Sequence, residues 1–177
     1  MIGVLDANSL EYLYEINLGE NGKNPDNLII KDNYLITVNN KDWSGSSISK
    51  INLENNEIIT QNLSELSTGC GTSNLRGDYI NYQISGDSEL YKFNIENMET
   101  MGIEKNLNLN FYEITQDPIN NYLYATNTDF SSYGTLYVYD DDNTIINSIS
   151  VGVSPGKIEF YNSNNEQISI NEINLKN

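Results

Sequence analysis

Two polar loops carry the residue types that could bind a ligand. Each loop, at 39–46 and at 127–134, combines an Asp–aromatic pair with Asn, Ser and Gly, and the first holds the only tryptophan of the chain. Large aromatic side chains on loops are typical anchors for sugars, planar rings or partner side chains. A shorter loop at 85–88 adds one acidic residue. We predict a ligand-binding site at Asn40, Asp42, Trp43, Asp87, Asp129, Phe130 and Tyr133.

Two of these aromatic residues have a structural alternative. Trp43 and Phe130 could instead pack beneath their own loops and extend the core. The 13 tyrosines mostly follow strand alternation, so we expect most of them to pack between sheets with the hydroxyl reaching water. Arg76, the only arginine, lies in a predicted turn, and we expect a solvated or ion-paired surface residue there.

The residue types disfavour catalysis. The chain has no histidine, which excludes Ser-His-Asp and Cys-His mechanisms and any His-ligated metal site. The single cysteine, Cys70, lies between two glycines with little cationic charge nearby in sequence, so we expect a small buried residue rather than a nucleophile. We predict no catalytic residue and no cofactor.

The acidic run 140–143 resembles part of a calcium loop. It lacks the glycine and the distal glutamate of a helix–loop–helix site. It also falls at a predicted hairpin, where Asp and Asn favour turn geometry. We therefore assign the run to a turn and predict no metal site.

The charge balance limits the partners. Nine basic against 25 acidic residues give −16 at pH 7. This argues against nucleic acid and against an anionic membrane surface, both of which require a basic footprint. No apolar run approaches the roughly 18 residues of a membrane span. The expected partner is a small molecule, a glycan or a protein, and a homodimer is possible.

Four segments repeat along the chain and define its organisation. Each is an apolar alternating run that ends in Asp or Asn, followed by a polar turn and a second β-like run. The spacings are 46, 42 and 46 residues, and 43 more lead from the last, through the end of the chain, to the first. Several strands per unit at this period are typical of propeller blades. The closing residues are Asp6, Asn52, Asn94 and Asp140.

We predict an all-β propeller of four-stranded antiparallel blades in one domain, 1–177. Complete blades are expected at 24–64, 69–104 and 109–152, and the fourth is shared between the chain ends, with outer strands from 1–19 and inner strands from 156–177. A shared blade closes the ring and removes exposed edges. Four blades could form a small ring or half of a larger ring made by two copies. The alternative fold is a β-sandwich with coincidental spacing.

Six runs of the chain carry a likeness to a known family: 69–73, 79–86, 89–95, 121–126, 134–140 and 151–156. They resemble segments of the surface-layer-type, YVTN-like propeller lipoproteins of gut bacteria, a group that includes the surface-exposed cobalamin-binding propellers. The likeness covers roughly residues 24–161 and implies a propeller fold and a binding role, with no site residue carried over.

Function and location follow from these points as expectations. We expect a non-catalytic binding module that presents aromatic and acidic loops on one rim. The alternatives are an assembly protein of a cell surface or virion, joined through blade edges, and a propeller lyase or hydrolase. The first residues show no basic or hydrophobic leader region. The resemblance favours the cell surface or the extracellular space if a leader has been removed, and otherwise the location stays open.

Overall fold

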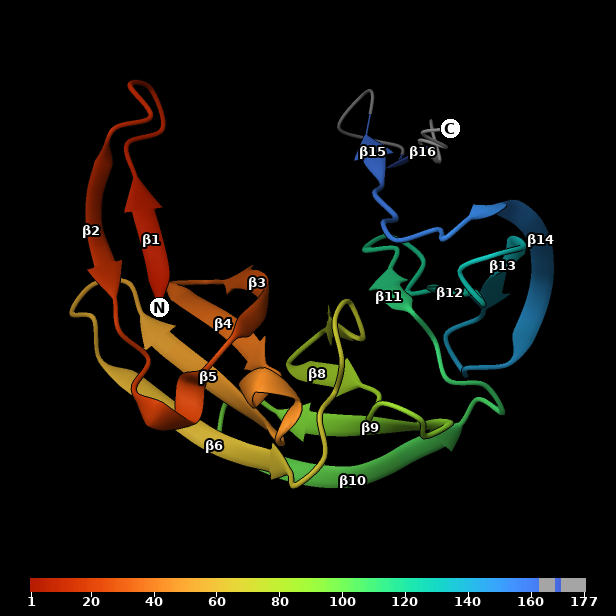
Figure 1. Cartoon of the computed structure of the whole chain (residues 1–177), viewed down its shortest axis with the longest axis horizontal. Helices are drawn as coiled ribbons and strands as arrows, with labels where there is room; N and C mark the ends of the chain where they lie inside the picture. The colour runs from red at the N-terminus through yellow and green to blue at the C-terminus, as the bar shows by residue number, and fades with distance from the viewer. Residues whose placement is uncertain (163–167, 170–177) are drawn as a thin grey trace. The chain divides into compact units, whose positions relative to one another are not determined.

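The computed structural model describes residues 1–162, 168 and 169 of this chain (Figure 1). The described part is almost entirely β, and none of its helices is long and apolar enough to cross a membrane. It divides into two compact units, residues 1–68 and the remainder from Gly69, and each is described by itself below.

The unit of residues 1–68 contains six strands and two short 3-10 turns. One sheet is the hairpin β1–β2, and the other is a meander in the order β3-β4-β5-β6. The elements are β1 (Ile2–Leu5), β2 (Tyr12–Ile16), η1 (Glu20–Gly22), β3 (Pro25–Lys31), β4 (Tyr34–Asn39), η2 (Lys41–Trp43), β5 (Ser46–Asn52) and β6 (Ile58–Ser64).

The unit that begins at Gly69 contains two more meanders and a short hairpin. The sheets follow the orders β7-β8-β9-β10, β11-β12-β13-β14 and β15-β16. The strands are β7 (Ser73–Arg76), β8 (Tyr79–Tyr82), β9 (Glu89–Asn94), β10 (Glu99–Asn106), β11 (Glu113–Gln116), β12 (Leu123–Asn127), β13 (Tyr133–Tyr139), β14 (Ile145–Val153), β15 (Tyr161–Asn162) and β16 (Ile168–Ser169).

The three four-stranded meanders are propeller blades, and the predicted β-propeller fold is confirmed. Every described strand pairs antiparallel with its neighbour in the sequence. A β-sandwich would join its two sheets through Greek-key connections, so that some adjacent strands would be distant in sequence. The described ladders contain no such pair.

The repeat detected in the sequence has a local physical cause. All four closing residues accept, through Oδ1, the backbone N–H of the residue two positions ahead, at 2.8–3.1 Å. This Asx turn starts the hairpin between the third and fourth strands of a blade, and Asp and Asn are the residues that form it. The four residues are Asp6, Asn52, Asn94 and Asp140.

The two halves of the predicted shared blade form separate hairpins. The turn between β1 and β2 uses Asp6 as the complete blades use their closing residues, which agrees with β1 and β2 being third and fourth strands. The inner half is shorter than expected: β15 covers only Tyr161–Asn162, and residues 157–160 are not in a strand. Residues 163–167 and 170–177 of the predicted inner strands lie outside the described part. Joining of the halves into one blade, and the single domain, stay predictions.

Buried apolar side chains hold the sheets together within each unit. In the first unit, Ile2 and Ile16 of the hairpin pack with Leu35 and Ile51 of the meander. In the second, alternation along β12 buries both faces of its sheet: Leu123 and Ala125 enter one cluster and Tyr124 another. The first of these clusters also contains Leu90, Leu107, Phe111, Ile114 and Tyr139, so it joins the sheet β7–β10 to the sheet β11–β14.

Cys70 is exposed, which corrects the expectation of a buried residue. Strand β7 begins only at Ser73, so the cysteine precedes the crowded inner strand. Its neighbours Gly69 and Gly71 both have left-handed backbone angles, with φ of 78° and 72°, and the chain turns sharply there.

Arg76 is ion-paired, one of the two states expected for it, but it is mostly buried and is not a surface residue. Its side chain is only 14% exposed and lies 3.8 Å from the Glu104 carboxylate. The guanidinium also donates to the Asn143 side chain and to the carbonyl groups of Asn121 and Asp141. The planar fork of donors therefore joins the sheet β7–β10 to the turns of the next sheet.

A buried amide fixes the connection between β10 and β11. Gln83 is fully buried, and its Nε2 donates to the carbonyl of Leu109 at 2.9 Å. Its Oε1 accepts the N–H of Phe111 at 2.9 Å. One side chain thus supplies the two hydrogen bonds that this irregular backbone lacks, since buried backbone groups must be paired.

We expect Gln83→Met to lower the free energy of unfolding by about 2–4 kcal/mol, because each buried backbone group left unpaired costs about 1–3 kcal/mol. The matched control is Gln116→Met, whose half-buried amide bonds to Asn121, and we expect it to cost less than about 1 kcal/mol. Denaturant unfolding measures both. Equal losses in the two variants would contradict the role of Gln83.

Candidate functional site

The β4–β5 loop carries Trp43 on a backbone that hydrogen bonds of Asn40 hold in place. Lys41, Asp42 and Trp43 all have left-handed φ angles of 46°, 54° and 66°. Asn40 is buried, its N–H donates to the carbonyl of Asn24, and its own carbonyl accepts the N–H of Trp43. The Trp43 side chain is 61% exposed, so it does not pack beneath its loop.

The β4–β5 loop therefore divides the predicted site residues by role. Asn40 shapes the loop, because its side-chain Oδ1 also accepts from the Asn24 amide. Asp42 and Trp43 are exposed at the turn and are available to a ligand.

The β12–β13 loop is also held by its own hydrogen bonds. The Asp129 carboxylate accepts the N–H groups of Ser131 and Ser132 at 2.9 and 2.7 Å, and the Ser132 hydroxyl at 2.8 Å. The two backbone donors, followed by the hydroxyl of Ser132, hold the pKa of Asp129 far below its usual range. This carboxylate therefore organises the loop, and its role toward a ligand stays a prediction.

The exposed aromatic side chains here are Phe130, in the β12–β13 loop, and Tyr133, the first residue of β13, at 60% and 78%. The Phe130 ring meets Tyr112 edge to face, with centroids 5.1 Å apart and planes at 85°. Tyr112 precedes β11 and was not predicted as a site residue. An aromatic doublet next to the inner strand, Phe111 and Tyr112, is the sequence signal that could have identified it.

Asp87 lies in the β8–β9 loop and is engaged within its own sheet. Its carboxylate accepts the Tyr91 hydroxyl at 2.6 Å and the Glu89 N–H at 3.1 Å. The Tyr91 bond is the main cause of a lowered Asp87 pKa, and the same bond raises the pKa of Tyr91 to about 12. Asp87 therefore stabilises the loop as a hydrogen-bonded anion.

Asn110 ties the β8–β9 loop to the end of β12. Its amide donates to the carbonyls of Ile84 and Asp87 at 3.0 and 2.7 Å, and accepts the N–H of Gly86. Its own carbonyl accepts from the Asn127 amide at 3.0 Å. The β8–β9 loop, which contains Asp87, therefore lies beside the start of the β12–β13 loop, which contains Asp129 and Phe130. The Trp43 loop belongs to the other unit.

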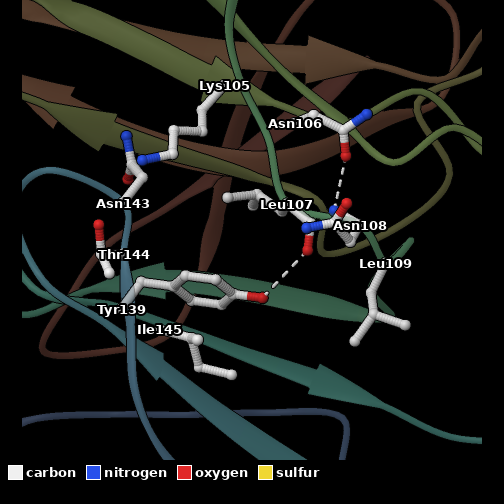
Figure 2. A pocket seen from close by; sticks show the side chains of 9 residues that line it. All are labelled: Lys105, Asn106, Leu107, Asn108, Leu109, Tyr139, Asn143, Thr144 and Ile145. Carbon is white, nitrogen blue, oxygen red and sulfur yellow. Dashed lines mark hydrogen bonds between the residues drawn. The ribbon is translucent and has the colours of Figure 1, made fainter.

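A cavity of about 330 Å³ lies between the end of β10 and the β13–β14 turn (Figure 2). Figure 2 shows the Tyr139 ring below Leu107, with its hydroxyl directed at the Leu107 carbonyl, 3.4 Å away. The lining residues were not predicted, because none stands out in the sequence. They are Lys105, Asn106, Leu107, Asn108, Leu109, Tyr139, Asn143, Thr144 and Ile145.

The oxygen atoms of the turn at Asp140 accept hydrogen bonds from other groups of the protein. The Asp140 carboxylate accepts the N–H groups of Asp142 and Thr144. The carbonyls of Asp141 and Asp142 accept from Arg76 and Lys105. Calcium would need such oxygens as ligands, and two cations already occupy this turn. Across the described residues, no three His, Cys, Asp or Glu side chains gather as a metal site would need.

Comparison with known proteins adds a distant likeness in fold. No family model and no curated protein matches the chain. Among solved structures, the chain is similar to the β-propeller domain of the Trilobed protease from Pyrococcus furiosus, which is described as having an open velcro topology. The two are 13% identical with a TM-score of 0.44, over 72% of this chain and 42% of that chain. The resemblance to gut-bacterial lipoproteins stays a prediction.

We expect protonation of Asp129 to disorganise the β12–β13 loop only under strongly acidic conditions. Because the pKa of Asp129 is lowered by folding, its carboxylate stabilises the loop fully at any pH above the unfolded pKa of about 3.9. This stabilisation is lost only as the pH falls through the lower pKa of the folded state. The amide resonances of Ser131 and Ser132 should keep their positions from pH 7 down to about 4.

Asp129→Ala should shift both serine resonances at neutral pH, because the acceptor is gone. Asp141→Ala, which removes an exposed carboxylate from another turn, should leave them unchanged. A midpoint for the Ser132 amide near the ordinary Asp value would contradict the assignment.

Proposed function

We propose that this chain is a non-catalytic binding module. Its exposed loop aromatics, Phe130 and Tyr133 in one unit and Trp43 in the other, would contact a small molecule, a glycan or a protein. The β-propeller fold supports a role as an interaction or structural module, and the residues of the loops, not the fold, argue for binding.

The observation that carries this proposal is exposure of large aromatic rings on loops of fixed backbone. Asn40 and Asp129 hold the two loops by hydrogen bonds. Trp43, Phe130 and Tyr133 nevertheless remain more than half exposed. Anchors that are already ordered lose little conformational entropy on binding, which favours affinity.

The test is a titration of the whole chain with a panel of neutral oligosaccharides and small planar ring compounds. Binding is monitored by Trp43 fluorescence and by amide NMR. Phe130→Ala and Trp43→Ala should each weaken binding at their own loop by about tenfold or more, as expected for anchor aromatics. The control is Tyr12→Ala, an exposed aromatic residue on β2 that lies outside both loops. No response across the panel, or equal effects of all three variants, would overturn the proposal.

A second candidate function, assembly with another copy, is favoured by the sheet β1–β2. This sheet has only two strands in the described part, so one edge of β1 has no ladder. Leu5, Tyr12, Leu13 and Tyr14 are all exposed on it. An unpaired edge with apolar side chains is a template for pairing with a further chain.

Assembly through β1 predicts a particle larger than the 20.0-kDa chain, measured by native mass spectrometry over a range of concentrations. Leu5→Lys should restore the monomer, because a charge on an edge strand opposes pairing. The matched control Leu66→Lys changes an exposed leucine that lies in no strand and should leave the mass unchanged. A monomer at every concentration would exclude this candidate.

A further inference from the structure

The cavity between β10 and the β13–β14 turn has the size and the mixed lining of a ligand site. Its volume of about 330 Å³ falls at the lower end of the range for small-molecule sites, roughly 300–1,000 Å³. The Tyr139 ring and Leu107, both buried, form one apolar wall of the cavity. The exposed side chain of Ile145 forms a second apolar wall. Burial, with a smaller effect of Tyr137, raises the pKa of Tyr139 to about 12, so the phenol stays neutral.

Lys105 is the only charged residue in the lining of the cavity, although the chain carries −16 overall. Three nearby carboxylates are engaged within the protein: Glu89 accepts from the Asn106 amide, Glu104 accepts from Asn143, and Asp140 accepts the N–H groups of Asp142 and Thr144. Asp141 and Asp142 of the same turn add negative charge beside the cavity. Lys105 is therefore the group of the lining that can pair with an anion.

Three polar groups of the lining retain hydrogen-bonding capacity. An ammonium has three donors, and Lys105 uses one on the Asp142 carbonyl at 2.9 Å. The side chains of Asn108 and Thr144 make no hydrogen bond to any other residue in the described part of the chain. By contrast, the amides of Asn106 and Asn143 are already bonded on both sides.

We propose that this cavity binds a small hydroxylated carboxylate of ring size, such as an acidic sugar unit. Lys105 pairs with the carboxylate, and Asn108 and Thr144 bond to ligand hydroxyls, since an amide and a hydroxyl both donate and accept. The apolar face of the ring packs on Tyr139 and Ile145. The site is separate from the loop aromatics of the proposed function and does not depend on them.

The experiment is a titration of the whole chain with D-glucuronate, monitored by amide NMR. D-glucose serves as the uncharged control sugar. We expect shifts at Leu107, Asn108 and Thr144 with a millimolar or tighter dissociation constant for glucuronate, and at least tenfold weaker binding of glucose. Added salt should weaken glucuronate binding, because a partly exposed ion pair is screened.

Two variants separate the effect of the Lys105 charge on binding from the effect of the cavity volume. Lys105→Gln should weaken glucuronate binding about tenfold or more and remove the preference over glucose. Ile145→Trp should fill the cavity and reduce the binding of both sugars while Lys105 remains. Lys157→Gln is the matched control, since it removes an exposed lysine of the same unit outside the cavity. Unchanged affinity in Lys105→Gln, equal binding of the two sugars, or no shift at the cavity would overturn the proposal.

Discussion

The hydrogen bonds from Gln83 to the β10–β11 connection are the interaction on which the second unit depends. A blade must pass its chain from the outermost strand to the innermost strand of the next blade, and this passage has no ladder of its own. The buried amide of Gln83 pairs with one carbonyl and one N–H of the passage. Leu107 and Phe111 can then enter the core beside Ile114 and Leu123 without leaving buried backbone groups unpaired.

The same connection places both candidate binding surfaces. Asn110, at its middle, joins the β8–β9 loop to the end of β12 and so aligns two loop ends on one edge. Tyr112, at its end, packs against Phe130. Leu107 and Asn108, at its start, line the cavity with Tyr139. A six-residue passage therefore fixes the positions of the Tyr112–Phe130 pair and of one wall of the pocket.

Cations in this acidic chain stabilise contacts between and within sheets. Arg76 and Lys105 reach from the sheet β7–β10 to carbonyl groups of the Asp140 turn. Within the sheet β7–β10, Lys92 lies 4.0 Å from Glu104 and also over the ring of Tyr79. These groups are partly buried, so they are screened less than surface pairs.

The sequence by itself determined the blade pattern, because that pattern rests on local rules. Asp6, Asn52, Asn94 and Asp140 each form a turn with residues only two positions ahead, and strand alternation has a period of two. The sequence also placed Trp43 and Phe130 in polar loops, but it left open whether they pack beneath those loops, and only the structure shows that both are exposed.

Only the tertiary structure decided which polar residues are buried and which cavity they surround. Gln83 acts on residues 26 and 28 positions away, and Arg76 on residues 28 to 67 positions away, so neither role has a signal in the local sequence. Cys70 faces outward because two left-handed glycines turn the chain before the inner strand begins. The pocket at Tyr139 exists only where two sheets meet, since its lining comes from two segments, 105–109 and 139–145, that are at least 30 positions apart.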